Sequence, residues 1–300
     1  MGHAALEVRG LTKRFGPQVA VDDVSFDVPA GRIVGFLGPN GAGKSTTLRT
    51  IVGLNAATAG TALIHGQPFS ELERPAQTVG SVVDGVGFHP GRRAIDELRI
   101  AASAAGIPAP RCREMLALVG LAEVERKRVG RFSLGMKQRL GLAAAMLGDP
   151  QVLLLDEPAN GLDPEGIQWV RAFLRYLADD GRAILVSSHL LGEVARLVDE
   201  VLVIRQGRIV ASGTVAELTA AAGGASVRVA SQDDAALTAE LERSGATVTP
   251  VEGALQVQGM DPSAVGGAAL TAGVALTELR ALSPELEDIF LELTAGGEIA

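Results

Sequence analysis

The chain has 300 residues, of which 47% are hydrophobic and 21% are charged, so it is long enough for roughly two globular domains. Its net charge of −8 argues against a protein that binds nucleic acid through a generally basic surface. Cys112 is the only cysteine, which excludes an intrachain disulfide and fits a reducing compartment. The sequence has neither an apolar leader nor an apolar run of about 18 residues, so we expect a soluble, cytoplasmic protein.

The charge is unevenly distributed along the chain. Residues 223–300 carry 3 basic and 12 acidic side chains, whereas residues 1–222 carry 24 and 23. The small-residue segment Ala220–Ala225 lies at this change and is typical of a linker. The sequence therefore predicts an N-terminal domain over 1–222 and a C-terminal accessory domain over 223–300.

The first predicted strand is Ile33–Leu37, a short apolar run with β-branched residues. A glycine-rich turn and a helix from about Lys44 to Leu54 follow it, and Thr61–His65 and Val79–Val83 are further candidate strands. The order of strand, glycine-rich turn and helix is the context in which a phosphate-binding loop works.

The segment GPNGAGKST at 38–46 matches the P-loop pattern G-x-x-x-x-G-K-[ST] in that context. Its glycines let the backbone approach an anion closely, and backbone N–H groups at the helix N-terminus supply donors for phosphate oxygens. Lys44 is expected to reach the β- and γ-phosphates, and the Ser45 hydroxyl is expected to coordinate Mg²⁺. The predicted ATP-binding residues of this loop are Gly38, Pro39, Asn40, Gly41, Ala42, Gly43, Lys44, Ser45 and Thr46.

An Ala- and Leu-rich stretch runs from about Ala94 to Leu147 and is interrupted by glycine and proline breakers. This pattern predicts a mainly helical subdomain, over about 85–147, inserted in an α/β frame. The region is also basic, with 11 basic and 6 acidic residues over 84–139. Its basic face is either an ordinary solvated surface or a contact for anionic lipids or acidic partner segments.

The segment VLLLDEP at 152–158 is predicted to be a buried strand stopped by Pro158. Asp156 then lies at the carboxyl end of the strand, where ligand sites of open α/β sheets form, and one carboxylate there can hold the Mg²⁺ shell. Glu157 is placed to act as the general base on an attacking water. Together with the loop at 38–46, this segment predicts a P-loop NTPase.

The next predicted elements are a helix over Glu165–Ala178, a strand over Ala183–Ser187, and a hairpin of Val201–Ile204 and Arg208–Ala211 around a Gln206–Gly207 turn. Apolar strands that alternate with helices favour a mostly parallel sheet covered on both faces. The fold class expected for the N-terminal domain is therefore α/β.

The C-terminal domain contains an internal repeat with an offset of 28 residues. Val227–Asp234 recurs as LQVQGMDP, and Gly245–Thr249 recurs as GVALT. Each copy predicts strand, helix, strand, and two copies give the βαββαβ order of a ferredoxin-like α+β fold. An amphipathic helix over Pro284–Leu293, capped by Ser283, is expected to follow.

The segment FSLGMKQRL at 132–140 indicates the class of P-loop NTPase, because it resembles the signature loop of the ATP-binding subunits of ABC transporters. The family's usual leading Leu is Phe132 here, its first Gly is Leu134 and its Gln is Met136. Ser133 is able to cap the following helix, and Gly135 permits close approach to a phosphate. The signature residues expected from the resemblance are Ser133, Leu134, Gly135, Met136 and Lys137.

The resemblance also implies roles for single residues outside the signature loop. Asp163 falls in the D-loop. His189 falls at the switch histidine, which contacts the γ-phosphate and the attacking water in the family, and Phe15 falls where the family places an aromatic ring against adenine. A structural histidine and a core phenylalanine are the alternatives. Asp84 occupies the place of the usual Gln, and a metal-proximal role is carried over to it, although a carboxylate donates no hydrogen bond.

As a whole, the resemblance implies an ATP hydrolase that uses ATP and Mg²⁺, pairs as a homodimer, and powers transport through separate transmembrane permease subunits. The bacitracin and drug-resistance exporters are the most similar subgroup, which implies efflux of a drug or antibiotic, at the inner face of the cell membrane and without nucleic acid. One alternative is a soluble ABC ATPase that acts on ribosomes or DNA, although the chain holds one set of motifs. Another is a nucleotide sensor without hydrolysis, against which Asp156 and Glu157 argue.

Overall fold

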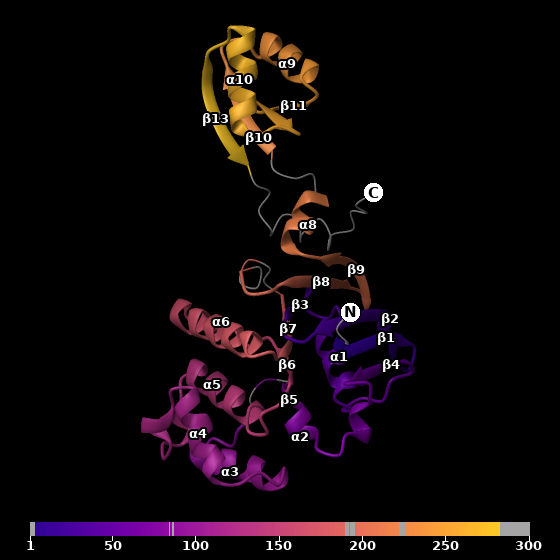
Figure 1. Ribbon diagram of the computed structural model, residues 1–300, viewed down its shortest axis with the longest axis vertical. Helices are drawn as coiled ribbons and strands as arrows, with labels where there is room; N and C mark the ends of the chain where they lie inside the picture. The colour runs from indigo at the N-terminus through magenta and orange to yellow at the C-terminus, as the bar shows by residue number, and fades with distance from the viewer. Residues whose placement is uncertain are drawn as a thin grey trace. The chain divides into compact units, whose positions relative to one another are not determined.

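The computed structural model describes residues 4–83, 85, 87–189, 192, 196–221 and 226–282 (Figure 1). It contains two compact units, Met1–Ser212 and Gly213–Ala300, and each has its own hydrophobic core. Asp84 and the predicted helix over Pro284–Leu293 lie outside the described residues. Within the described part of the chain, no helix is both long and apolar enough to cross a membrane.

A six-stranded sheet forms the centre of the first unit, in the order β5-β6-β7-β3-β8-β9. Its strands are β3 (Ile33–Leu37), β5 (Val79–Val82), β6 (Val152–Asp156), β7 (Ala183–Ser188), β8 (Glu200–Arg205) and β9 (Arg208–Gly213). The pairs β5/β6, β6/β7, β3/β7 and β3/β8 are parallel, and every residue of β3, β6 and β7 is buried. A strand covered on both faces has a continuous apolar sequence. The predicted parallel sheet is confirmed.

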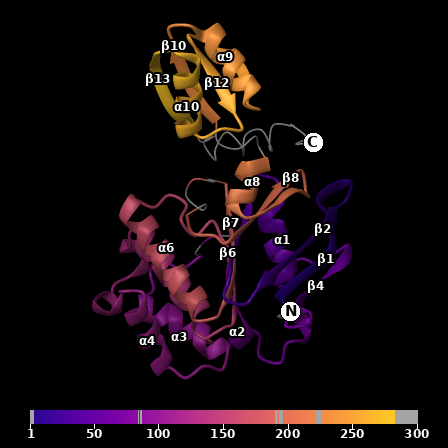
Figure 2. The ribbon, with the colours of Figure 1, turned by 45° about the horizontal axis from the view of Figure 1, so that its top comes forward.

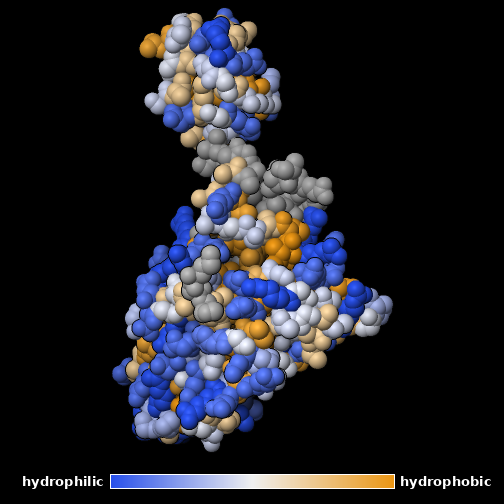
Figure 3. Space-filling model, turned by 45° about the vertical axis from the view of Figure 1, so that its right-hand side comes forward, coloured by the Kyte–Doolittle hydropathy of each residue, from blue (hydrophilic) through white to orange (hydrophobic). Residues whose placement is uncertain are grey.

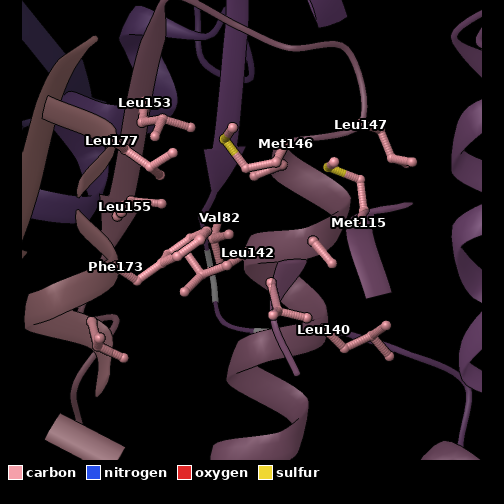
Figure 4. Close-up of a cluster of buried hydrophobic side chains, with 14 of the residues drawn as sticks. Val82, Met115, Leu140, Leu142, Met146, Leu147, Leu153, Leu155, Phe173 and Leu177 are labelled. Carbon is pink, nitrogen blue, oxygen red and sulfur yellow. The ribbon is translucent and has the colours of Figure 1, made fainter. Parts of the chain in front are cut away.

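Different elements cover the two faces of the central sheet (Figure 2). The helices are α1 (Lys44–Ile51) and α6 (Pro164–Asp179). Leu153 and Leu155 of β6 share a core cluster with α6, and Figure 4 draws them in one group with Leu177 and Phe173 of that helix. Val152 and Leu154 belong to the cluster that holds α1. The division follows from the strand itself, because successive side chains of a strand point to opposite faces.

The α1 helix ends at Ile51, before the predicted end at Leu54. The N–H of Leu54 donates to the carbonyl of Arg49 (2.8 Å), and the N–H of Gly53 donates to the carbonyl of Thr50 (3.2 Å). Gly53 has a φ of 73°. This is the Schellman pattern, in which a glycine in the left-handed region closes a helix, and it explains why the helix is shorter than expected.

A second, antiparallel sheet of this unit has the order β2-β1-β4, with β1 (Ala4–Phe15), β2 (Gln18–Pro29) and β4 (Ala59–Ile64). The strand β4 overlaps the predicted strand Thr61–His65. The expectation of Ile33–Leu37 as the first strand is wrong, because β1 and β2 precede it. Buried and exposed residues alternate over Val24–Val28, which is the pattern of a half-buried strand. Such an alternating strand gives a weaker sequence signal than the apolar runs of the central sheet.

The predicted helical subdomain contains α3 (Ala94–Ala104), α4 (Pro110–Leu118) and α5 (Leu134–Ala145). The short elements before and within it are Phe69–Glu71, α2 (Pro75–Thr78), Ala122–Val124 and Val129–Arg131. Its apolar residues join the core cluster on the α6 side of the central sheet, where Figure 4 shows Leu142 and Met146 with Val82 of β5. One continuous core therefore attaches the helical subdomain to the strands that carry the candidate site.

The second unit consists of α8 (Val215–Ala221) and a βαββαβ arrangement. The elements of the latter are β10 (Ser226–Ser231), α9 (Asp234–Arg243), β11 (Thr247–Val251), β12 (Ala254–Gln258), α10 (Pro262–Ala272) and β13 (Leu276–Leu282). Its sheet is antiparallel, in the ferredoxin-like order β11-β12-β10-β13. Asp233 caps α9 by accepting from the N–H of Ala236 (3.0 Å), and Asp261 caps α10 in the same way at Ala264 (2.8 Å). This order of elements is the one that the repeat predicts.

Candidate active site

The predicted site residues meet at the carboxyl ends of three neighbouring parallel strands. The loop 38–43 follows β3, Asp156 ends β6 and Glu157 follows it, and His189 follows β7. Residues of these segments line a cavity of about 700 Å³. The end of β1, the first residues of β2 and the turn Gln206–Gly207 between β8 and β9 complete its wall. This edge of an open parallel sheet is where ligands bind in α/β folds.

Two glycines of the P-loop are required by close backbone contacts. Gly43 has a φ of 112°, and a Cβ there would lie 2.5 Å from the carbonyl oxygen of Ala20. A Cβ on Gly38 would lie 2.4 Å from the carbonyl oxygen of Ile204. The loop is therefore packed against β2 and β8, and any larger residue at either position would push it away from them. The N–H groups of the first α1 turn have no acceptor inside the helix, which leaves them for an anion.

Lys44 lies at the floor of the cavity, with 5% of the residue exposed. Its Nζ donates to the carbonyl oxygens of Gly38 (2.6 Å) and Pro39 (3.3 Å) and lies 3.3 Å from Oε1 of Glu157. Asn40, Gly41, Gly43, Ser45 and Thr46 also line the cavity. Gly38 and Ala42 are buried and Pro39 is exposed, and none of these three lines the cavity. A buried cation held by backbone carbonyls and one carboxylate is suited to binding a polyanion.

Glu157 and His189 form a directly bonded pair. Nδ1 of His189 lies 2.7 Å from Oε2 of Glu157, and both residues line the cavity and are partly buried. The two Glu157 oxygens thus face different partners, Lys44 and His189. The carboxylate is fixed at the cavity wall, in a position to accept a proton from a molecule bound there.

Asp156 is buried behind the cavity, and Ser187 is its partner. The Ser187 hydroxyl donates to Oδ1 of Asp156 (2.5 Å) and accepts from the N–H of Glu157 (3.0 Å). Asp156 and Ser187 are opposite one another in the parallel register of β6 and β7. The sequence pattern predicts β7 to end at Ser187 and indicates no role for that residue.

Of the predicted metal-binding residues, Ser45 lines the cavity, Asp156 lies behind it, and Asp84 is outside the described residues. In the described ranges no cluster of three or more His, Cys, Asp or Glu side chains could hold a metal ion by itself. Mg²⁺ does not need such a cluster, since it retains waters and binds through one or two protein oxygens together with substrate phosphates. Ser45 and Asp156 therefore fit Mg²⁺ and do not fit a metal held entirely by protein side chains.

Phe15 ends β1 at the far side of the cavity, where 48% of the residue is exposed. A core role for Phe15 is therefore wrong. Nζ of Lys13 lies 4.7 Å from the centre of the Phe15 ring. Gln18, which is opposite Phe15 in the β1/β2 register, and Gln206 line the same cavity, and no sequence motif indicates either of them as a site residue. An exposed ring beside amide side chains is suited to stacking against a planar polar group.

The signature residues lie apart from this cavity, since none of the five appears among the described residues that line it. Ser133 caps α5, as predicted, by accepting from the N–H of Met136 (3.2 Å). Leu134 is exposed, and Gly135, Met136 and Lys137 are partly exposed. The signature loop is therefore accessible at the surface and does not line the cavity at the P-loop of the same chain.

Asp163 is the N-cap of α6, where its Oδ1 accepts from the N–H of Gly166 (2.9 Å). It does not line the cavity, whereas Asn160 of the same segment does. Gly161 lies close to Leu134, because a Cβ on Gly161 would be 2.9 Å from Cδ2 of Leu134. The segment after Glu157 thus touches the signature loop.

Comparison with known sequence families finds that residues 21–160 match a family described as ABC transporter. Residues 225–287 match a domain of unknown function. Residues 127–195 match an AAA domain described as a putative AbiEii toxin of a type IV toxin–antitoxin system. The first match contains the P-loop, the signature loop, and Asp156 with Glu157.

Similar proteins include bacitracin transport ATP-binding protein BcrA of Bacillus licheniformis, 43% identical over 68% of both chains. Bacitracin transport ATP-binding protein BcrA of Enterococcus faecalis is 33% identical, and Nod factor export ATP-binding protein I of Burkholderia orbicola (strain AU 1054) is 38% identical, each over 98% of both chains. A solved structure titled as the ATP binding subunit of an ABC transporter is 30% identical, with a TM-score of 0.65 over 73% of this chain and 93% of that one. The similarity therefore extends through the second unit in two relatives.

Proposed function

This chain belongs to the ATP-binding subunits of ABC transporters, and we propose that it hydrolyses Mg-ATP to drive export of a drug or peptide antibiotic through separate membrane subunits. The observation that supports this best is the contact of Glu157 with both Lys44 and His189 at a cavity lined by the P-loop. Relatives named for transport of bacitracin and of a lantibiotic, and for Nod factor export, support the direction and class of cargo.

In this proposal the triphosphate lies along the P-loop, with Lys44 and the first α1 turn as its donors. Phe15 stacks against the adenine ring at the other end of the cavity. Ser45 and Asp156 would hold Mg²⁺, which neutralises phosphate charge when it is bound. When the triphosphate binds, the Lys44 ammonium moves from Oε1 of Glu157 to the phosphates. Oε1 of Glu157 is then free to face the attacking water.

Glu157 is the general base that accepts the proton of the attacking water, and His189 orients it. The 2.7 Å contact with Nδ1 of His189 holds one carboxylate oxygen, so that the other is directed into the cavity. The water attacks the γ-phosphorus as the bond to the β–γ bridging oxygen breaks, which leaves ADP and phosphate. The positioned carboxylate and Lys44 together supply proton acceptance and charge stabilisation.

We propose that two copies act together. The signature loop lies away from the cavity of its own chain, and its partly exposed glycine and capped helix N-terminus are suited to a phosphate supplied by a second copy. Asp163, next to this loop, belongs to the same contact. The division into a catalytic domain over 1–222 and an accessory domain over 223–300 is part of the proposal, with stability or dimerisation as the role of the latter.

A soluble ABC ATPase that acts on ribosomes or DNA is the alternative. Phosphate release by the purified chain with Mg-ATP tests the activity, and affinity capture from gently solubilised cells tests the context. Capture of an integral membrane protein in ATP-dependent amounts is the expected result. Capture of ribosomes or DNA instead would overturn the export proposal and would leave the ATPase assignment intact.

Association with the inner face of the membrane is supported by a basic patch, which we define as Arg93, Lys127 and Arg128. All three side chains are exposed, and none has an ion pair within the described part of the chain, whereas Arg99 and Arg113 pair with nearby carboxylates. Arg93 is opposite Arg128 in an isolated β-bridge, where like charges are destabilising. The face of the first unit that Figure 3 shows is largely hydrophilic. Charge therefore favours the anionic lipids of the cytoplasmic leaflet as the partner.

A variant with Gln at Arg93, Lys127 and Arg128 is expected to bind anionic vesicles about 100-fold more weakly than the wild type, since each charge near such a surface contributes about 1 kcal/mol. Co-sedimentation with vesicles of about one-third phosphatidylglycerol measures this. The matched control replaces Arg99, Arg111 and Arg113, which have carboxylate partners, and should bind like the wild type. Equal binding by the patch variant would contradict the lipid contact and favour an acidic segment of a protein partner.

A further inference from the structure

We propose that Gln138 and Ser187 are positioning residues that hold the backbone of Glu157, so that its carboxylate stays directed into the cavity. This inference rests on Glu157 being the general base. Neither residue lines the cavity, and each contacts the main chain of the segment 157–158 from a different side. Their side chains come from separate elements, α5 and β7.

The backbone of Glu157 needs such support because of its conformation. Glu157 has a φ of 50°, in the left-handed region that residues with a side chain rarely adopt. A conformation of this kind persists only where neighbouring groups hold it, and it is found preferentially at functional sites. The next residue, Pro158, restricts Glu157 further. Without external contacts, this peptide would relax and rotate the carboxylate away from Lys44 and His189.

Ser187 holds the amino side of Glu157. It is fully buried, and its single hydroxyl proton goes to Asp156 (2.5 Å), which leaves the oxygen to accept from the N–H of Glu157 (3.0 Å). The Ser187 hydroxyl thus contacts both the carboxylate of Asp156, the proposed metal ligand, and the main chain of Glu157, the proposed base. It holds these two groups at a fixed distance from one another. Alanine at this position would leave the N–H of Glu157 and an oxygen of the buried Asp156 carboxylate without this partner.

Gln138 holds the carbonyl side of the same segment. Gln138 is 8% exposed. Its Nε2 donates to the carbonyl oxygen of Pro158 (3.2 Å) and, at longer range, to that of Glu157 (3.5 Å). Gln138 lies in α5, five residues after the capping residue Ser133 of the signature loop. Because a helix is stiff over this distance of about 7.5 Å, a displacement of the signature loop moves the Gln138 amide and the peptide that it holds. Gln138 therefore connects the signature loop to the base.

The test compares Gln138→Leu and Ser187→Ala in the full-length chain. Each is expected to lower kcat about 10- to 100-fold, as loss of an outer-shell partner does, and to change the Kd for ATP less than about twofold. Ser187→Thr keeps the hydroxyl and should recover most of the rate. Leu140→Val, a buried change in α5 that touches neither carbonyl, should lower the melting temperature with kcat retained. Values of kcat within about twofold of wild type in both positioning variants would overturn the proposal.

A double-mutant cycle separates positioning from folding. In a Glu157→Gln background, Gln138→Leu and Ser187→Ala should have little further effect on the residual rate, because both act through Glu157. An equal loss of rate in that background would identify a merely structural role and would also overturn the proposal. If Glu157→Gln alone is fully active, the general-base assignment fails first. If Glu157→Gln is inactive while Gln138→Leu and Ser187→Ala are both normal, only the positioning inference fails.

Discussion

Replacement of Glu157 by Gln is expected to lower ATP turnover about 1000-fold, within the range contributed by a positioned general base, while ATP is still bound. Gln has the same shape, and its amide oxygen can still accept from Lys44, which lies 3.3 Å from Oε1 in the native chain. An amide does not accept the proton of the attacking water. ATP then stays intact between the two copies. We expect hydrolysis to be the step that releases the two copies from one another, so the dimer of Glu157→Gln should accumulate with Mg-ATP.

Phosphate release and size-exclusion chromatography with Mg-ATP measure the two parts of this expectation. The matched control is Glu165→Gln, which makes the same chemical change at an exposed carboxylate in the first turn of α6. The control should hydrolyse ATP like the wild type and should not trap a dimer. Undiminished hydrolysis by Glu157→Gln would remove the general-base assignment.

Local patterns were sufficient to predict the strands that form the centre of the fold. β3, β6 and β7 are buried on both faces, so their sequences are mainly apolar up to the carboxyl ends, where the site begins. The P-loop lies between its strand and helix as expected. In the second unit, the 28-residue repeat contains both the hydrophobic pattern and the capping residues Asp233 and Asp261. Each of these features is encoded in a local or repeated sequence pattern, and such a pattern can be recognised without the tertiary structure.

The parts that were missed depend on contacts between residues far apart in the sequence. Ser187 looks like the end of an apolar strand, and its role arises only because β6 and β7 pair with Asp156 opposite it. Gln138 is a polar residue within a helix, and only the packing of α5 against the 157–158 segment brings its amide to two carbonyls. No pattern within either segment encodes these pairings, since both depend on tertiary packing.

The turn between β8 and β9 illustrates the same limit. Its hairpin was predicted, and φ values of 48° at Gln206 and 81° at Gly207 fit the tight turn that joins such strands. Its second function was not predicted. The N–H of Gly207 donates to the carbonyl of Ala42 (2.9 Å), and its carbonyl accepts from the N–H of Asp22 (2.8 Å). The turn therefore links the P-loop to β2, which helps to hold the loop in its anion-binding form.

Replacement of Lys44 by Ala is expected to weaken ATP binding about 1000-fold. A cation about 4 Å from a phosphate charge contributes roughly 4 kcal/mol where the effective dielectric constant is about 20, and Lys44 is nearly fully buried. The same change removes the donor that the carbonyls of Gly38 and Pro39 share, so the loop loses internal bonds as well as charge. The Glu157 carboxylate then faces the triphosphate without an intervening cation, which adds repulsion to the lost attraction.

Titration with a fluorescent ATP analogue measures the affinity of Lys44→Ala, and circular dichroism establishes that the variant is folded. Lys127→Ala is the matched control, since it removes an exposed lysine of the helical subdomain that does not line the cavity. The control should bind the analogue as tightly as the wild type does. Raised ionic strength should weaken the wild type more than Lys44→Ala, because the variant lacks the charge that salt screens. Wild-type affinity in folded Lys44→Ala would show that this ammonium does not hold the phosphates.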